Sequence, residues 1–200
     1  MSSEKQETTP AKVDGRVQRS ERSREAIIKA MLDLVEDGNL VPTAQQIADS
    51  AGVGIRSVFR HFEDMESMFD SANELTWPKT QDLFVGGDRE GTLSQRILHA
   101  TERHANAFET LKHIMLSTQA RRWHSSTLRK NYARAQRGLR KDLDNWLPEL
   151  ASLSTVRREA VDAAASFENW HRLREHQGLS KKTSIRVVIE MLELLISENG

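Results

Sequence analysis

Apolar residues recur at intervals of three and four along most of this 200-residue chain. That spacing places them on one face of an α-helix, and no stretch alternates with period two for long enough to form a sheet. Only four prolines and ten glycines interrupt the pattern. The first stripe begins after Ser23, ends at Asp37-Gly38-Asn39, and consists of Ile27, Ile28, Met31, Leu32 and Val35. The sequence therefore predicts an all-α fold of about nine helices.

The composition excludes several classes of protein. The chain has no cysteine, which removes disulfides, thiol catalysis, iron–sulfur clusters and the usual structural zinc sites. Hydrophobic residues make up 38% and the mean hydropathy is −0.60, so we expect no membrane-spanning helix and no membrane partner. The segment from Met1 to Pro10 is too polar for a secretory signal, which predicts a cytoplasmic protein. The 29 basic and 29 acidic residues cancel, so any affinity for nucleic acid has to come from a local pattern.

Two capping boxes and one turn-rich stretch divide the chain. Thr43 and Gln46 form the first box, in which the hydroxyl accepts the third amide of the helix and the glutamine reaches back; Thr92 and Gln95 repeat it. The stretch from Trp77-Pro78 to Gly91 is rich in turn residues. We expect a disordered basic arm at 1–20, a helical domain at 21–76 that includes a connecting fourth helix, and a larger helical domain at 77–200. Further amphipathic segments lie near 112–122, 125–146, 155–176 and 181–197.

Residues 43–62, TAQQIADSAGVGIRSVFRHF, have the pattern of a helix-turn-helix. The first helix carries the small Ala48 on its apolar face, which permits a close crossing, and Gly52 makes a tight turn without a Cβ clash. The apolar residues of the second helix are Val53, Val58 and Phe62. A helical corner that serves only for packing would show the same apolar pattern, so the outer face of the second helix decides the interpretation.

That outer face is polar and partly basic, and its members are Ile55, Arg56, Ser57, Phe59, Arg60 and His61. A guanidinium such as that of Arg56 binds guanine O6 and N7 as a fork, a hydroxyl binds a phosphate or a base edge, and an aliphatic side chain contacts a thymine methyl. We therefore predict a site for double-stranded DNA on this face, together with Thr43, Gln45 and Gly54.

The stretch from Ser23 to about Leu75 resembles the DNA-binding region of TetR-family transcriptional repressors. The shared features are Thr43, Ile47-Ala48, Ala51-Gly52-Val53, Phe59-Arg60-His61-Phe62 and Glu66 in an acidic fourth helix. Three positions depart from the family: Gly54 replaces a serine, Phe59 a tyrosine and Met65 a lysine. The resemblance implies a repressor that binds a palindromic operator as a homodimer. It also implies that a small-molecule effector enters the carboxy-terminal body, shifts the fourth helix and releases the DNA.

Basic residues near the start of the chain are further candidates for phosphate contacts. They are Lys12, Arg16, Arg19, Arg22 and Arg24, opposed by Asp14 and Glu21. A basic arm can follow phosphates or enter a minor groove, whereas a solubilising tail would have the same composition. Both interpretations of these residues stay open.

The last two amphipathic segments are apolar on more than one side. A helix of that kind needs two partners, which are its own core and, most simply, a second copy of the chain. The resemblance implies the same four-helix interface. The predicted interface residues are Ala160, Ala163, Phe167, Ile185, Val188, Leu192 and Leu195. The alternative is a monomer that buries both faces internally.

The resemblance also implies an effector pocket in the carboxy-terminal domain. Its candidate lining residues are Phe108, Trp123, His124, Trp146 and Trp170, and packed core is the alternative for each aromatic side chain. Arginine and lysine occur throughout 121–141, where no acidic residue is found. This basic segment is either a wall that contacts the ligand or a solvated helix face.

No pattern indicates an enzyme, a metal or a cofactor. A ferritin-like site needs two Glu-x-x-His motifs, and only Glu168 with His171 fits. His99 and His104 are five residues apart, which takes them off a common helical face. We therefore predict a DNA-binding regulator. The alternative is a helical protein-interaction or architectural module that binds nucleic acid without sequence specificity through residues 121–141.

Overall fold

The computed structural model describes residues 15–197, and these residues are all-helical, as predicted. The α-helices are α1 (Gly15–Glu36), α2 (Ala44–Ser50), α3 (Ile55–His61), α4 (Met65–Asp82), α5 (Leu93–Arg121), α6 (Ser126–Trp146), α7 (Thr155–Ala164), α8 (Phe167–His171) and α9 (Lys181–Ile196). Short 3-10 turns follow α5 and α6 at Arg122–His124 and Pro148–Ser152. A π-helical turn at Arg172–His176 continues α8.

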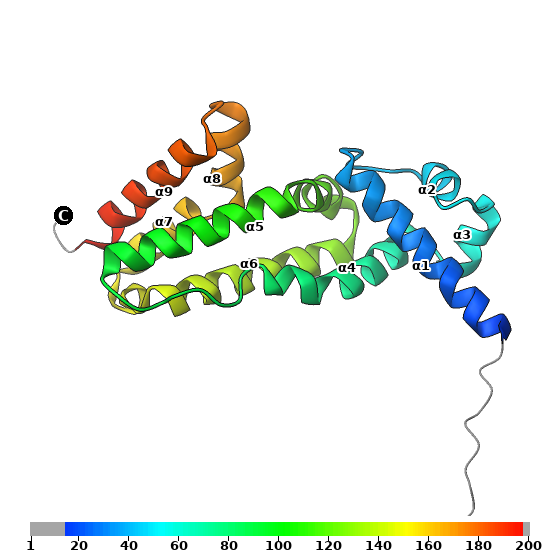
Figure 1. Ribbon diagram of the computed structural model, residues 1–200, viewed down its shortest axis with the longest axis horizontal. Coiled ribbons are helices and arrows are strands. Elements are labelled where there is room, and N and C mark those ends of the chain that lie inside the picture. Colours follow the sequence, from blue (N-terminus) through cyan, green and yellow to red (C-terminus); the bar gives the residue numbers. More distant parts are fainter. Residues whose placement is uncertain (1–14, 198–200) are drawn as a thin grey trace, which may run out of the picture.

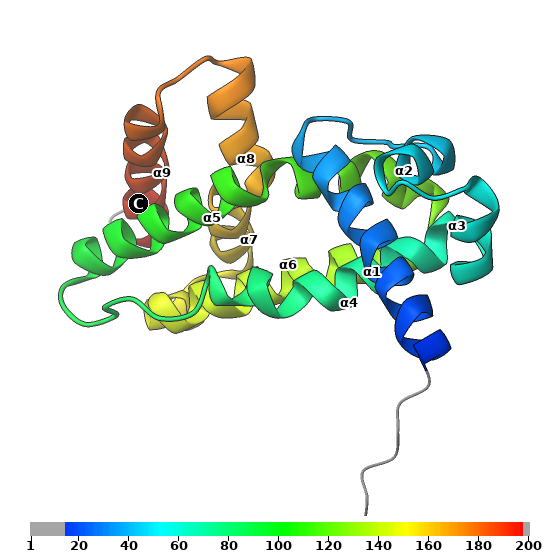
Figure 2. The same cartoon turned by 45° about the vertical axis from the view of Figure 1, so that its right-hand side comes forward.

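The helices form an elongated molecule with α2 and α3 at one end and α9 near the other (Figure 1). The long helix α5 runs through the body and packs against α6 and α9, and α7 packs against α9 (Figures 1 and 2). Helix α4 extends from the end that holds α3 to the flank of α6. The fourth helix therefore belongs physically to both parts of the molecule.

Both predicted capping boxes form. The Thr43 hydroxyl accepts the backbone N–H of Gln46 at 3.3 Å, and the Thr43 N–H donates to the Gln46 side chain at 2.9 Å. Thr92 and Gln95 make the same pair of hydrogen bonds at the start of α5. Each box satisfies amides that a helix start otherwise leaves without an intrahelical partner, which fixes where α2 and α5 begin.

Some helix bounds differ from those predicted. Helix α1 begins at Gly15 instead of near Ser23, so residues 15–20, expected in a disordered arm, are helical; residues 1–14 of that arm lie outside the described residues. Arginine, glutamine and glutamate favour helix without adding to an apolar stripe, which is why periodicity missed this turn. Helix α4 continues through Trp77 and Pro78 to Asp82. The domain boundary expected between residues 76 and 77 falls inside this helix and stays a prediction.

The amphipathic segment at 155–176 is also not one helix. It is interrupted at Ala165 and Ser166, and the Ser166 hydroxyl accepts the backbone N–H of Asn169 at 3.2 Å to start α8. A serine that caps a new helix reads as an ordinary polar position when only the apolar pattern is followed.

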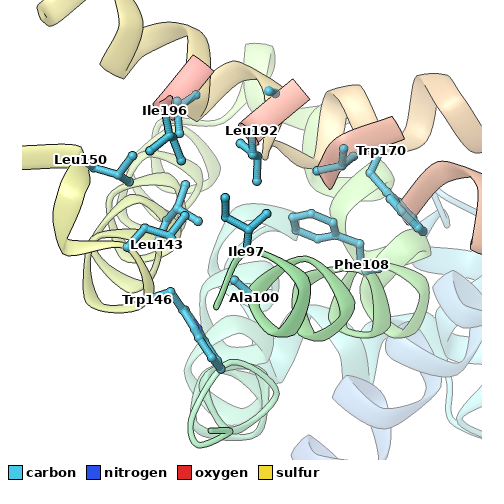
Figure 3. Packing of buried hydrophobic residues seen from close by; sticks show 14 of the residues in the cluster. Ile97, Ala100, Phe108, Leu143, Trp146, Leu150, Trp170, Leu192 and Ile196 are labelled. Carbon is cyan, nitrogen blue, oxygen red and sulfur yellow. The ribbon is translucent and has the colours of Figure 1, made fainter. Parts of the chain in front are cut away.

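Two hydrophobic clusters hold the helices together. The first joins α1, α2, α3 and α4, and its most buried members include Ile27, Ile47, Ala48, Val58 and Met68. The second cluster joins α5, α6, α7, α8 and α9. Figure 3 shows Ile97, Leu143 and Leu192 of this second cluster converging from α5, α6 and α9. Helix α9 packs against α5 and α7, and the apolar side chains on that side of it are buried within the single chain.

Partly buried polar contacts connect α5 and the loop before it to α6 and the turn after it. Arg96 donates to the backbone carbonyl of Trp146 at 3.1 Å and to Glu149 at 2.9 Å. Asp142 of α6 accepts from Arg89 at 3.0 Å through one carboxylate oxygen and lies 2.9 Å from His104 Nε2 through the other. Both oxygens of Asp142 are therefore engaged, which fixes the orientation of this part of α6.

Candidate nucleic-acid interface

The residues 43–62 fold as the predicted helix-turn-helix. Ile47, Ala48 and Val58 are 0% exposed and pack under α1. Gly52 has φ of +65°, and the Val53 N–H donates to the Ala48 carbonyl at 3.0 Å across the turn. Only glycine adopts that backbone conformation without strain, so the sequence at this position sets the angle at which α3 leaves α2.

The outer face of α3 projects away from the body. Arg56 and Arg60 are exposed, and no residue of the described chain forms an ion pair with either. Ile55 is 37% exposed and Phe59 is 49% exposed, although both are large apolar side chains. A helix of this length with apolar and cationic side chains turned to solvent offers the chemistry that base edges and phosphates require.

Ser57 and His61 are half-buried, unlike the other residues of the predicted outer face. The His61 Nε2 atom is buried and has no hydrogen-bond partner in the described chain. Burial, followed by the positive charges of Arg60 and Arg24, lowers the pKa of His61 and so favours the neutral ring. His61 therefore lies at the edge of the outer face, beside the helix core.

Thr43, Gln45 and Gly54 lie at the starts of the two helices. All are exposed, but the Thr43 hydroxyl is occupied by its capping box and Gln45 donates to Asp49 at 2.8 Å. Gly54 is the N-cap of α3 and supplies no side-chain hydrogen bond there. In the first turn of α3 the Ser57 N–H donates to the Gly54 carbonyl at 2.8 Å, and no side chain caps the amides of this turn.

The basic residues near the start of the chain divide into two kinds. Arg16, Arg19 and Arg22 are exposed on the first turns of α1, which begins beyond the end of α3 (Figure 1). Arg24 is instead structural: its guanidinium lies 5.2 Å from the centre of the Phe62 ring and donates to Ser71 of α4 at 2.6 Å. The sequence left the role of Arg24 open, because Phe62 and Ser71 are distant from it in the chain. Lys12 lies outside the described residues.

Glu66, at the start of α4, holds the helix-turn-helix to the body. Its carboxylate accepts the backbone N–H of Thr127 at 2.8 Å and the Ser126 hydroxyl at 2.9 Å, both at the start of α6. These hydrogen bonds, the one from the Thr127 backbone first, lower the pKa of Glu66 to about 2. In the sequence Glu66 is one of the features shared with the TetR family, and only the structure shows that it caps the start of α6.

A second joint connects the end of α1 to α5. The Ser117 hydroxyl donates to the backbone carbonyl of Leu40 at 2.7 Å, and His113 Nδ1 lies 2.5 Å from the Glu36 carbonyl. Arg121 stacks over the Phe69 ring of α4 at 3.8 Å. Through these contacts, α5 touches both α1 and α4. These two helices pack with α3 in the first hydrophobic cluster, so the contacts connect the body to α3.

A cavity of about 750 Å³ lies between these joints, enclosed by α1, α4, α5 and α6. Along α4 its lining follows one helical face: Phe69, Ala72, Thr76 and Thr80. Met31 of α1, Ile114 of α5 and Leu128 of α6 close the other sides. The volume lies within the usual range for small-molecule sites, and one wall is the helix that joins α3 to the body.

None of the predicted pocket residues lines this cavity. Phe108, Trp146 and Trp170 are at most 4% exposed and belong to the second hydrophobic cluster. Trp146 also borders a separate hollow of about 420 Å³ beside α5. Trp123 is 68% exposed, with Arg122 stacked on it, and His124 is exposed. A large aromatic side chain suits a packed core as well as a cavity wall, and the sequence does not distinguish the two positions.

The predicted dimer residues lie partly inside the protomer. Phe167, Val188 and Leu192 are at most 6% exposed in the second cluster, so they offer no surface to a partner. Ala160, Ile185 and Leu195 are half-buried, and Ala163 is exposed. The larger apolar side chains on this end of the molecule are Val156, 79% exposed, and Leu194, 69% exposed.

Residues 15–197 contain no group of three histidine, aspartate or glutamate side chains placed to hold a metal ion. None of the helices in that range is both long enough and apolar enough to cross a bilayer.

No protein-family model and no curated protein matches the sequence. Solved structures do match the fold. A transcriptional regulator from Rhodococcus sp. Rha1 has a TM-score of 0.63 and 16% identity, over 88% of this chain and 95% of the other. A TetR-family transcriptional regulator from Streptomyces coelicolor has a TM-score of 0.65 and 19% identity, over 88% of this chain and 82% of the other. With a helix-turn-helix at one end and a cavity-bearing helical body behind it, the protein has the fold of a TetR-family transcriptional regulator.

Proposed function

We propose that the protein is a DNA-binding transcriptional regulator of the TetR family. The observation that carries the proposal is the outer face of α3, where Arg56, Arg60 and Phe59 are exposed on a helix whose other side is fully packed. The likeness to solved transcriptional regulators supports it, and so does the Ser23 to Leu75 motif.

In this proposal α3 enters the major groove. Arg56, near the start of the helix, binds a guanine edge as a fork, and Ile55 contacts a thymine methyl. The exposed arginines Arg16, Arg19 and Arg22 on the first turns of α1 bind phosphates. Phosphate contacts release counterions, so affinity falls as salt rises, with a slope set by the few basic residues available.

We further propose that two copies bind a palindromic operator. A homodimer gives two recognition helices related by a two-fold axis, and such a pair reads two half-sites of inverted sequence. The surface for this contact is the end of the molecule that exposes Val156 and Leu194. The Arg157 side chain donates to the Ser197 carbonyl at 3.2 Å, which places the start of α7 beside the end of α9 in one patch.

The regulator is proposed to act as a repressor that a small molecule releases. The 750 Å³ cavity is the effector site, since α4 forms one wall of it and carries the helix-turn-helix through the first cluster. A ligand that fits better when α4 is displaced shifts the population toward the displaced form and changes the spacing of the two recognition helices. The ligand must bind the released form more tightly for this coupling to operate.

A second candidate function rests on α6. Arg129, Lys130, Arg134 and Arg137 are exposed along it, a basic surface that suits an architectural module with no sequence preference. The regulator requires Arg56 of α3 for binding its selected duplex, whereas the architectural module requires the arginines of α6 for binding any duplex.

Arg56→Ala tests the proposal, with Arg137→Ala as the matched control that removes the same charge from α6. On the duplex that the wild-type protein selects from a random pool, Arg56→Ala is expected to weaken binding by about 1–3 kcal/mol, and little on unrelated duplexes. Arg137→Ala should leave both unchanged. Titration of labelled duplexes at fixed salt measures the affinities. An equal loss on all duplexes, or a larger effect of Arg137→Ala, would favour the architectural module.

A further inference from the structure

We propose that the effector is an organic anion with an apolar body, and that its charged group binds at the cavity rim beside Lys141. The inference rests on the proposed function, because it names the chemistry of the ligand for the same cavity. Four features of the described residues carry it: the apolar interior, the charge of the lining, the engagement of Asp142 and the position of Gly138.

The interior of the cavity is predominantly apolar. Its deep walls are formed by Met31, Val35, Phe69, Ile114 and Leu128, which come from four different helices. Most of its polar lining groups are uncharged amides and hydroxyls, such as those of Asn131 and Thr118. A cavity of about 750 Å³ with such walls holds the hydrocarbon or aromatic body of a ligand, which burial removes from water.

The charged groups of the lining leave a net positive charge. They are Arg89, Lys141 and Asp142. Arg89 is neutralised by Asp142 at 3.0 Å. Lys141 is exposed and has no acidic partner within ion-pair distance in residues 15–197. The formal charge of two basic groups and one acidic group is therefore +1, and it resides on Lys141.

A cationic ligand finds no equivalent site. Asp142 is the acidic residue of the lining, and its two oxygens are bound to Arg89 and to His104 at 3.0 and 2.9 Å. A ligand cation would have to displace one of these partners from a carboxylate whose side chain is 14% exposed. An anion only has to approach the exposed ammonium of Lys141, which costs little desolvation.

The surface around Lys141 strengthens this preference. Arg134 lies on the same face of α6, its guanidinium stacks 4.1 Å from the centre of the Trp77 ring, and it has no acidic partner in the described chain. Trp77 itself lines the cavity. The positive charges of Arg134 and Lys141 beside this apolar opening raise the local concentration of anions.

Gly138 provides the opening between these cations. It lies in the middle of α6, four residues after Arg134 and three before Lys141, so all three share one face of the helix. A Cβ at Gly138 would meet no atom within 4 Å, and its φ is not in the left-handed region, so neither packing nor backbone geometry requires glycine. Glycine in a helix interior costs about 1 kcal/mol relative to alanine. Its missing side chain leaves the rim open where Lys141 is exposed.

A pair of fluorescent probes tests the inference on the full-length protein without DNA. Anilinonaphthalene sulfonate is an apolar body with an anionic group, and phenylnaphthylamine is the same ring system without the charge. Lys141→Gln is compared with Lys130→Gln, which removes the same charge about 16 Å along the exposed face of α6. At physiological salt this separation exceeds the screening length of about 8 Å, so the control leaves the rim unaffected.

We expect Lys141→Gln to weaken sulfonate binding about three- to fivefold and to leave phenylnaphthylamine binding unchanged, whereas Lys130→Gln changes neither. Gly138→Phe covers the rim and should weaken both probes at least about tenfold. The inference is overturned if Lys141→Gln and Lys130→Gln bind the sulfonate alike, or if Gly138→Phe, shown folded by circular dichroism, binds it as the wild type does.

These outcomes are independent of the proposed DNA binding. If the wild-type protein selects a duplex but shows no dependence of sulfonate binding on Lys141, the anion inference fails and the regulator stands. If the probes behave as expected and no duplex is bound, the cavity keeps its assigned chemistry and the proposed function fails.

Discussion

Single residues define the turn that presents α3. Gly52 has a positive φ, whereas Gly54, two residues later, has an ordinary extended conformation and caps α3 with no side chain. The two glycines look alike in the sequence and do different things in the structure. One supplies a backbone angle that other residues adopt only with strain, and the other merely leaves a cap unfilled.

Gly52→Ala is therefore expected to lower the free energy of unfolding by about 1–2 kcal/mol, although its Cβ would meet no atom within 4 Å. The matched change Gly54→Ser adds a capping hydroxyl and should raise it by a few tenths of a kcal/mol. Urea unfolding followed by circular dichroism measures both. Equal effects of the two substitutions would mean that the backbone conformation at Gly52 is not what constrains the turn.

The sequence predicted residues whose partners are close in the chain. Thr43 and Gln46 are three residues apart, and their hydrogen bond forms as expected. Arg24 belongs to the basic segment whose role the sequence left open, and Glu66 to the family resemblance; their partners, Ser71 and Thr127, lie 47 and 61 residues away. A single sequence does not show which of its distant positions contact each other. The structural role of these two charged residues was therefore not predictable from it.

At the scale of helices, the joint between α4 and α6 depends on one carboxylate. The pKa of Glu66 in the folded chain is about 2, below its ordinary value of 4.5, because hydrogen bonds from the start of α6 favour the charged form. The depressed pKa means that the unfolded chain binds the proton more tightly. The stability from this contact is complete above pH 4.5 and is lost as the pH falls toward 2.

Glu66→Gln should lower the thermal midpoint at pH 7, and the difference from wild type should shrink as the pH is lowered through 4.5 toward 2. Glu74→Gln, on the same helix but exposed, is the control and should track the wild type at every pH. Differential scanning calorimetry across this range provides the midpoints. A difference that stays constant with pH would show that the charge of Glu66 is not the source of the contact's stability.

Helix types were predictable and their neighbours were not. The capping box at Thr92 gave the start of α5 and the apolar repeat identified α6. The separate segment expected near 112–122 is the end of α5, and the Ser166 cap that starts α8 was not recognised. Pro78 was taken as a helix end, although α4 continues to Asp82. A cavity wall needs the relative rotation of four helices, and Phe69, Thr76 and Ile114 look like any other helical residues in the sequence.

Helix α3 lies at one end of the molecule and α9 near the other (Figure 1), and the cavity is lined by α1, α4, α5 and α6. Val156 and Leu194 are the large apolar side chains exposed at the start of α7 and near the end of α9. The all-α class followed from periodicity alone. The side of α9 that remains exposed did not, since α9 is apolar on several sides and only the packing on α5 and α7 shows which side is already covered.

Leu194→Asp is expected to convert a homodimer into a monomer, because it introduces a charge into an apolar contact and Leu194 is 69% exposed in the single chain. Leu75→Asp makes the same change at a residue of α4 that is 56% exposed and away from α7 and α9, and should leave the oligomeric state unchanged. Sedimentation velocity distinguishes the two states. A wild-type protein that sediments as a monomer, or a Leu194→Asp variant that remains dimeric, would remove this patch from the account.

The most direct test of the central claim is selection of duplexes by the full-length protein from a random DNA pool. A pair of α3 helices related by two-fold symmetry predicts an enriched consensus made of two inverted half-sites, and Arg56→Ala should lose that enrichment. A pool that shows no consensus after repeated rounds, or the same weak enrichment with Arg56→Ala as with the wild type, would contradict the claim that the outer face of α3 reads DNA.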